Sequence, residues 1–186
     1  MEGVLRMSSY QSAVSAIETL GLAETNMKLA CYWLSLWHAD RPPSREDLDL
    51  RRMVELLPGL VLVDMHVGQG PVCRLSGTAV DRGLGRPLAG ANLLDFVSGD
   101  DRVTRVARMR SLLDGAVAVS RTGYSARPGV RDFVEVLQLP LSGTAEDGSC
   151  RYLGHINWRP SMGFARNPAP GLKLGMPDSY RIAAFH

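Results

Sequence analysis

The sequence has few cysteines, almost no lysine and no long apolar run. No stretch approaches the ~20 apolar residues that a helix needs to cross a bilayer, and residues 1–16 carry no signal-peptide pattern. The three cysteines (Cys31, Cys73 and Cys150) are widely spaced, which favours free thiols over a disulfide framework. No CxxC motif and no Cys/His cluster has zinc-ligand spacing. We therefore expect a cytoplasmic protein that does not insert into membranes and has no metal site.

The basic residues are nearly all arginine. Of 21, only Lys28 and Lys173 are lysine, which indicates a GC-rich, bacterial coding sequence. The formal net charge is +2, and four basic residues against one acid lie from Arg159 onward. The rest of the chain is close to neutral, so its composition shows no basic face that would bind nucleic acid. A length of 186 residues and a hydrophobic fraction of 45% suit one globular domain with extensions.

Helical patterns fill the first third of the chain. Residues 8–20 predict a short helix, and residues 27–39 predict a clearer one with Thr25 as its N-cap. Residues 44–57 predict a third helix, which ends at a Pro-Gly pair. These three helices precede the first strand-like run.

The apolar stripe of the 27–39 helix contains Ala30, Trp33 and Trp37. Two tryptophans on one stripe indicate either core packing or a partner-binding face, because large aromatic side chains dominate both. Core packing is the expected role of at least one of them. We interpret the helix as the element for dimerisation or signal transfer, so replacing both tryptophans with alanine should weaken self-association.

A hairpin is predicted over residues 60–76. Residues 60–67 are rich in β-branched side chains, and residues 71–76 return after a Gly-Gln-Gly turn. If the turn consists of those three residues, Asp64 lies directly opposite Arg74. A cross-strand ion pair then explains how a charged residue is tolerated inside the second strand.

Short helices and three further strands complete the pattern. Thr78 is predicted to cap a helix over residues 79–84, and a helical turn (91–97) and a longer helix (99–114, capped by Ser98) follow. The strands are predicted at 116–126, 131–141 and 150–159. Residues 160–186 show little periodicity and are interpreted as an irregular tail. The order predicts an α+β fold: one five-stranded antiparallel sheet with short helices on one face.

The order and wording of four segments resemble a PAS domain. They read YWLSLWHADRPPSREDLD (32–49), LLPGLVLVD (56–64), CRLSGTAV (73–80) and GRPLAGANLLDF (85–96). The set is similar to a PAS branch common in alphaproteobacteria and formerly described as a domain of unknown function. The resemblance implies a sensory or regulatory module over residues 25–160, including its flanking N-terminal helix. Residues 1–24 and 161–186 are then extensions on either side.

The resemblance also suggests where a ligand would bind. A PAS pocket lies between the sheet and the short helices, and the polar or aromatic residues that could line it are Arg74, Thr78, Tyr124, His155 and Trp158. A structural pair with Asp64 is the favoured role of Arg74, and core packing is the alternative role of Trp158. Neither the ligand nor a cofactor can be named from these residues, so the cofactor stays unknown.

Motifs for catalysis are missing. There is no GxSxG, no phosphate-binding loop and no cysteine in a catalytic signature, so no enzymatic activity is expected. His66 and His155 could ligate haem, but a role as ordinary strand histidines is favoured. Three hypotheses remain: a sensory module that binds a small ligand or a regulatory protein and signals in trans as a homodimer; a ligand-free scaffold; and, ranked last, a haem sensor or small enzyme.

Overall fold

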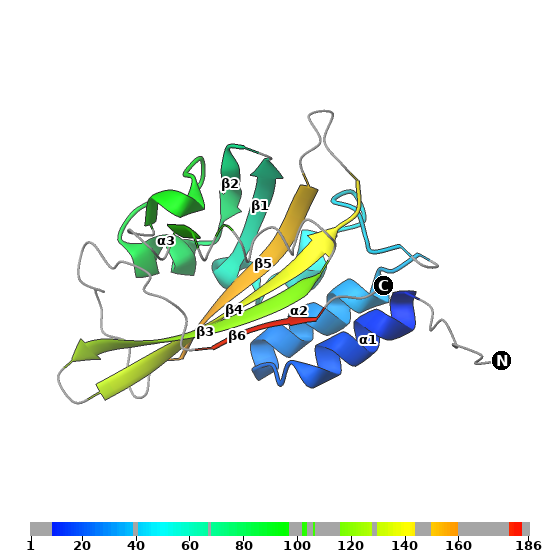
Figure 1. Ribbon diagram of the computed structural model, residues 1–186, viewed down its shortest axis with the longest axis horizontal. Coiled ribbons are helices and arrows are strands. Elements are labelled where there is room, and N and C mark those ends of the chain that lie inside the picture. Colours follow the sequence, from blue (N-terminus) through cyan, green and yellow to red (C-terminus); the bar gives the residue numbers. More distant parts are fainter. Residues whose placement is uncertain are drawn as a thin grey trace.

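The structure is a computed structural model that describes residues 9–38, 41–66, 68–96, 102–103, 106, 116–127, 130–143, 150–159 and 179–183. Side chains are described for these residues except at 9, 123–127, 130–133, 159 and 179–183. The described elements form one antiparallel sheet with helices on both faces (Figure 1). No helix in these ranges is long and apolar enough to cross a membrane.

Six strands form the sheet, in the order β2-β1-β5-β4-β3-β6. Their bounds are β1 (Leu60–His66), β2 (Gly70–Ser76), β3 (Val117–Arg127), β4 (Val130–Leu141), β5 (Cys150–Arg159) and β6 (Ser179–Ala183). All five predicted strands are present, and the predicted α+β fold class is confirmed. The predicted helix over 99–114 lies mostly outside the described residues.

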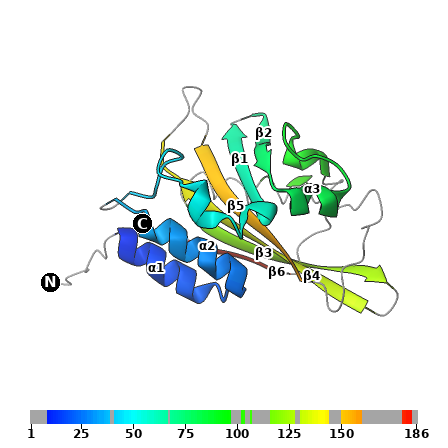
Figure 2. The same ribbon diagram turned by 180° about the vertical axis from the view of Figure 1, so that it is seen from behind.

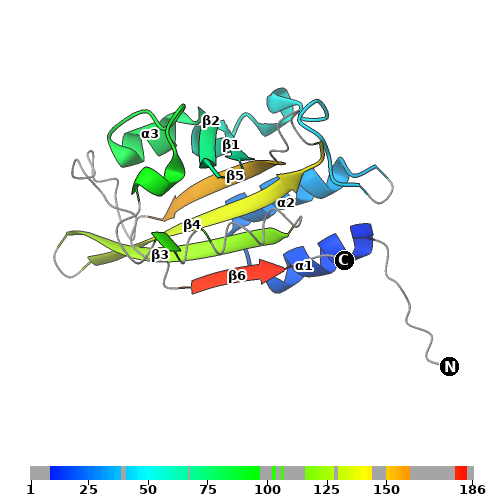
Figure 3. The same cartoon turned by 45° about the horizontal axis from the view of Figure 1, so that its top comes forward.

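The sixth strand was not predicted. Residues 179–183 lie in the predicted irregular tail, yet they pair with β3 so that Val117 faces Ala183 and Arg121 faces Ser179. Figure 3 shows β6 along the edge of the sheet beside β3. A five-residue strand gives almost no periodic signal, and its partner lies about 60 residues earlier in the chain, so local sequence patterns could not reveal it.

The two faces of the sheet are covered by different helices. Helices α1 (Ser9–Thr19) and α2 (Glu24–Ser35) pack on one face, and α3 (Thr78–Leu84) and the 3-10 turn η3 (Leu93–Phe96) lie over the other (Figure 2). We call these the α2 face and the α3 face. On the α2 face the helices bury an apolar core, which includes the large, fully buried side chains Trp33, Leu29, Leu137, Leu139 and Leu153.

The ends of α2 differ from the prediction. The helix begins at Glu24 with Ala23 as N-cap, and it ends at Ser35 instead of residue 39. Thr25 is therefore inside the first turn, and no side chain within the helix caps it. The backbone amide of Ala23 instead donates to the carboxylate of Glu135 on β4, a tertiary contact that a local pattern cannot show.

The predicted helix over 44–57 is replaced by shorter turns. Two 3-10 turns form, η1 (Leu50–Met53) and η2 (Leu57–Gly59). Asp49 caps η1 by accepting a hydrogen bond from the amide of Arg51 at 3.0 Å. Asp residues within a helical pattern favour such local hydrogen bonds over a continuous helix. The turns lead the chain from α2 into β1.

Candidate functional site

The α3 face carries the candidate ligand site of this fold. Helix α3 and η3 bury a second apolar cluster against the sheet, formed by Val61, Val63, Met65, Cys73, Val80, Leu84, Leu88, Leu94, Phe96, Ala118 and Tyr152. Gln138, Ser120 and Thr122 lie at positions of β3 and β4 that face the same side, because Ala118 pairs with Gln138 and side chains alternate along each strand. The described side chains on the α3 face are thus mostly apolar, with a few polar ones among them.

The start of α3 is fixed by a close backbone approach. A methyl group on Gly77 would lie 2.1 Å from the carbonyl oxygen of Leu57 in η2, so only glycine fits at this N-cap position. Thr78 is the first residue of α3 and is exposed, so its predicted capping role is wrong. Asp81 holds the other side of the helix by accepting from the Ser76 hydroxyl at 2.5 Å and the Leu88 amide at 3.0 Å.

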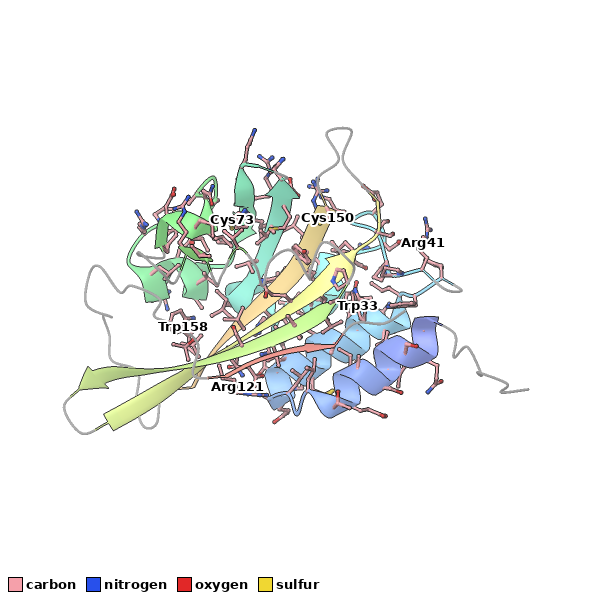
Figure 4. The ribbon with its side chains drawn as sticks, viewed as in Figure 1. Trp33, Arg41, Cys73, Arg121, Cys150 and Trp158 are labelled. Carbon is pink, nitrogen blue, oxygen red and sulfur yellow. The ribbon has the colours of Figure 1, made fainter. Side chains whose placement is uncertain are left out.

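Trp158 is the aromatic residue that faces α3 (Figure 4). A methyl group on Gly83 of α3 would lie 2.5 Å from Cζ2 of the indole ring, so helix and ring are in close contact. Tyr152, two strand positions before Gly154 on β5, is 2% exposed and belongs to the same apolar cluster. The ring face of Trp158 and the buried Tyr152 therefore mark β5 as the aromatic wall of the α3 face.

Two thiols lie near this face but are not activated. Burial raises the pKa of Cys73 to about 11, and its thiol donates to the carbonyl of Leu75 at 3.2 Å. Burial also raises the pKa of Cys150, whose thiol lies 3.8 Å from the hydroxyl of Tyr152. A nucleophilic cysteine needs a lowered pKa, so neither thiol is prepared for covalent chemistry.

The five residues predicted to line one pocket are not brought together. Trp158 lies on the α3 face, whereas Arg74 and His155 lie on the α2 face. Thr78 is exposed at the start of α3. The side chain of Tyr124 lies outside the described residues; its backbone in β3 pairs with Asp132. The prediction of a single pocket lined by all five is therefore wrong, because one-residue alternation puts neighbouring strand positions on opposite faces.

Arg74 does form an ion pair with Asp64, as predicted, but in another register. The two strands pair Asp64 with Val72, and Arg74 is the extra residue of a β-bulge on β2. This two-residue shift keeps Arg74 on the same face, and its Nε donates to Asp64 Oδ2 at 2.6 Å. The predicted register was therefore wrong by two residues, but the predicted face of the sheet was right. A shared face is sufficient for Arg74 to reach Asp64.

The sequence analysis missed the second partner of Asp64. Arg151 faces Asp64 across the β1–β5 pair and donates from Nε and Nη2 at 2.5 and 3.1 Å. Burial acts to raise the pKa of Asp64, but hydrogen bonds from Arg151 and Arg74 outweigh it and hold that pKa below its usual value. Arg74 also lies 3.4 Å from Nε2 of His66. A buried carboxylate between two guanidinium groups thus joins three strands.

His155 belongs to a second polar network, which no sequence pattern predicted. Its Nδ1 lies 2.7 Å from Oδ1 of Asn26 on α2, and Asn26 donates from Nδ2 to Glu135 of β4 at 2.8 Å. Glu135 also accepts from Nε of Arg121 on β3 at 2.8 Å. Asn26, Glu135 and His155 are all nearly inaccessible to solvent. Pairs over 100 residues apart in sequence leave no local signal.

The predicted dimer residues face the chain's own sheet. Ala30 and Trp33 are fully buried in the core of the α2 face, and the indole nitrogen of Trp33 donates to the carbonyl of Pro140 at 2.8 Å (Figure 4). Trp37 is half-buried and makes edge-to-face contacts with Trp33 and Tyr10 at centroid distances of 5.2 and 5.8 Å. Ala30 and Trp33 therefore do not form an exposed partner surface in this fold.

Metal ligands do not gather among the residues that the structure describes: no three His, Cys, Asp or Glu side chains stand close enough to hold an ion. His155, one of the two candidate haem ligands, is enclosed by Asn26 and η2, since a methyl group on Gly59 would lie 2.6 Å from its Nε2. Its ring is thus part of the α2-face network.

The fold and the short helices over one face define a class of protein. An antiparallel sheet in which the first strand lies between the second and the fifth, with short helices between the second and third strands, is the architecture of a PAS-type sensory module. The chain belongs to the PAS domain family, whose family model matches residues 22–157. The predicted family is confirmed, and its alphaproteobacterial branch stays a prediction.

Comparisons with individual proteins add little to this assignment. The crystal structure of a LOV protein from Rhodobacter sphaeroides is similar over 60% of this chain and 68% of its own, with 18% sequence identity and a TM-score of 0.40. No curated protein sequence matches the chain. The assignment therefore depends on the family match over residues 22–157.

Proposed function

We propose that this chain is a sensory PAS module that binds a small, largely apolar molecule on the α3 face and signals in trans through α1 and α2. The observation that carries the proposal is the different construction of the two faces. The α3 face is apolar and lined by Trp158 and Tyr152, whereas the α2 face holds a helix pair through directed hydrogen bonds. Strands β3, β4 and β5 contribute side chains to both.

The receiver of the signal is a second copy of the chain or a regulatory protein. The exposed side of α2, with Glu24, Lys28, Cys31 and Ser35, is the surface that this pair of helices offers to it. Three free cysteines support a reducing compartment such as the cytoplasm. The module has no catalytic output of its own in this proposal, consistent with the protonated state of Cys73 and Cys150.

A ligand-free scaffold is the second candidate. One observation favours it: Gly83 leaves no room for a methyl group beside Trp158, so at this point helix and sheet are already in contact. A scaffold would use the same α1–α2 surface without any molecule on the α3 face. The two candidates differ in whether the purified protein carries or takes up a ligand.

Native mass spectrometry of freshly purified protein, compared with its denatured mass, separates the two. We expect extra mass in the native spectrum that is lost in Ala118→Val, which adds volume to the α3 face. Val119→Ile is the matched control, because Val119 points to the α2 face. Folded protein without extra mass would favour the scaffold, and the same spectra report whether the chain is a dimer.

A further inference from the structure

The turn between α1 and α2 brings together two helix ends of opposite polarity. The carbonyls of Leu20 and Gly21 follow the C-terminal end of α1, and the amide of Ala23 stands at the N-terminal end of α2. Unpaired carbonyls give the first end a partial negative charge, and unpaired amides give the second a partial positive charge. A cation beside the first end and an anion beside the second are therefore favourable at this turn.

The sheet supplies both charges from one cross-strand pair. Arg121 on β3 lies directly opposite Glu135 on β4, and their side chains are 2.8 Å apart. Arg121 Nη2 donates to the carbonyls of Leu20 and Gly21 at 3.1 and 2.6 Å. Figure 4 shows Arg121 at the end of the helix pair where the turn lies.

Glu135 serves the other helix end. Its Oε1 accepts from the backbone amide of Ala23 and from Nδ2 of Asn26, both at 2.8 Å. Helix α2 has no capping side chain of its own. The side chain that accepts from the amide of its N-cap residue, Ala23, comes from a strand more than 100 residues away. Each charge of the pair thus complements the helix end that it touches.

The network continues into the next strand. Because a carboxylate only accepts, Nδ2 of Asn26 must face Glu135, and Oδ1 of Asn26 must therefore accept from Nδ1 of His155 on β5. Three adjacent strands, β3, β4 and β5, hold the turn together. We call Asn26, Arg121, Glu135 and His155 the turn clamp.

The same strands also reach the α3 face. Trp158 lies three residues after His155 on β5 and touches Gly83 of α3. Val134 on β4, which pairs with Trp158, is next to Glu135 in the strand. The path from Trp158 to Glu135 of the clamp therefore consists of one cross-strand pair and one step along β4.

Stability alone is a weak reason for this arrangement. Burying a carboxylate and a guanidinium costs about as much as their attraction returns, and apolar pairs of similar volume often stabilise as well. The clamp adds a dependence on geometry, because its hydrogen bonds to Gly21 and Ala23 form only while the strands stay in one position. The helices themselves stay packed through Ile17, Leu29 and Trp33.

We propose that the turn clamp is the coupling element of this module: a displacement of β4 or β5 from the α3 face breaks its bonds to Gly21 and Ala23 together and loosens the α1–α2 turn. The inference rests on the proposed function in taking α1 and α2 as the output. It assigns that output to a local release of the turn, with both helices still on the sheet.

Hydrogen exchange of the Ala23 amide in the full chain, measured by NMR, tests the clamp without any ligand. Gly83→Ala pushes on Trp158 from the α3 face and should speed exchange at Ala23 by about tenfold, within the usual range of coupling between sites. Thr78→Ala, an exposed change in the same helix, is the matched control and should leave exchange unchanged. The amide of Leu153 in the core of β5 reports global opening and should speed much less than that of Ala23.

The clamp is then removed and the same perturbation repeated. In Arg121→Met/Glu135→Met, Ala23 should exchange fast already, and adding Gly83→Ala should change it by less than about twofold. Glu135→Gln keeps an acceptor for Ala23 and gives an intermediate effect, and it replaces the double variant if that variant does not fold. The inference is overturned if Gly83→Ala leaves Ala23 unaffected, speeds Leu153 equally, or acts as strongly without the clamp.

These outcomes are independent of the proposed ligand. If the chain carries no small molecule but Gly83→Ala speeds exchange at Ala23 only when the clamp is intact, the clamp inference stands and the sensory proposal fails. A chain that binds a molecule on the α3 face but shows no coupling keeps the sensory proposal and loses the clamp.

Discussion

His155 shows how a single buried side chain sets a property of the whole fold. Burial lowers its pKa to about 4, and this effect outweighs the hydrogen bond with the backbone of Leu56 and the charge of Glu135, which both act to raise it. The ring is therefore neutral at pH 7, and its Nδ1 lies 2.7 Å from Oδ1 of Asn26. A neutral ring suits a position in the clamp where Arg121 already supplies the positive charge.

The stability of the protein should consequently depend on pH through His155. The folded pKa is below the reference value of 6.5, so the unfolded state binds the proton more readily and the free energy of unfolding falls between pH 6.5 and 4. The expected loss is on the order of 3 kcal/mol by pH 4, since each pKa unit is worth about 1.4 kcal/mol. Urea unfolding at several pH values measures it.

His155→Gln is the control for this window. It removes the titrating group while leaving an amide that can still reach Asn26, so the slope between pH 6.5 and 4 should flatten. Asp64 acts at lower pH, because its depressed pKa makes its contribution disappear only as the pH falls below about 3.8. Equal slopes for both proteins would show that another group causes the acid sensitivity.

At the scale of elements, α2 is a core helix with a polar outer side. Trp33 is the largest fully buried side chain, and its ring packs edge-to-face on Trp37 while its nitrogen bonds to β4. The outward positions of the helix carry Glu24 and Lys28, which form an ion pair at 3.3 Å. The tryptophan stripe thus explains why α2 stays on the sheet.

Substitutions at the two tryptophans should therefore differ in their effect on stability. Trp33→Ala should cost about 3–5 kcal/mol of unfolding free energy, because it opens a large cavity. Trp33→Phe should cost about 1–2 kcal/mol, since it leaves the carbonyl of Pro140 without its donor. Trp37→Ala, at a half-buried site, should cost less than Trp33→Ala. Urea unfolding combined with sedimentation velocity separates lost stability from lost association.

An unchanged stability of Trp33→Ala would contradict the buried position of this side chain. A stable, folded Trp37→Ala protein that no longer self-associates would instead favour the dimer role that the sequence suggested for this helix. Trp37 is the better test of that role because its ring reaches the surface.

At the scale of the molecule, the outer strand β2 is partly covered, and the edge of β3 is paired with β6. The edge strand β2 exchanges backbone hydrogen bonds with the segment after α3: Cys73 donates to Ala91 at 3.0 Å and accepts from Gly90 at 2.8 Å. On the other side β6 pairs with β3 and hides its edge (Figure 3). Uncovered edges invite pairing with other chains, so β6 protects the long edge of β3 and leaves a shorter, five-residue strand at this end of the sheet.

Removing β6 should expose that edge. A chain truncated after residue 160 should keep its cooperative fold, because α1, α2 and five strands remain, but it should self-associate more strongly than the full chain. Ile182→Pro in the full chain disrupts the same strand and should act in the same direction. Sedimentation velocity at several concentrations measures the effect, and a truncated chain as monodisperse as the full one would contradict it.

Much of the fold could be predicted because its elements are periodic. Alternating β-branched residues mark β1, and the helices around Trp33 and at residues 78–84 follow local patterns. The family resemblance adds that these elements form a PAS domain, which local patterns alone do not provide. Elements without a period were missed: β6 is too short, and the polar 44–57 segment became two 3-10 turns.

The candidate site was predicted less well, because faces and distant pairs depend on register. Arg74 found Asp64 despite a two-residue error, since an even shift preserves the face. His155 and Trp158 were assigned to one pocket, yet an odd spacing along β5 separates them. The spacing of the two residues is visible in the sequence. Counting alternate positions from the buried Tyr152 could therefore have placed each on its correct face.

The amino-acid sequence by itself determined the family, the five main strands and the apolar stripe of α2, because local periodicity and residue type are sufficient for these. Tertiary structure alone decided which side of the sheet each polar side chain serves and which distant charges meet. Arg151 reaches Asp64, and Glu135 caps α2, only after strands far apart in sequence have paired. The physical reason is that a hydrogen bond depends on position within a few tenths of an ångström, whereas burial depends only on the face.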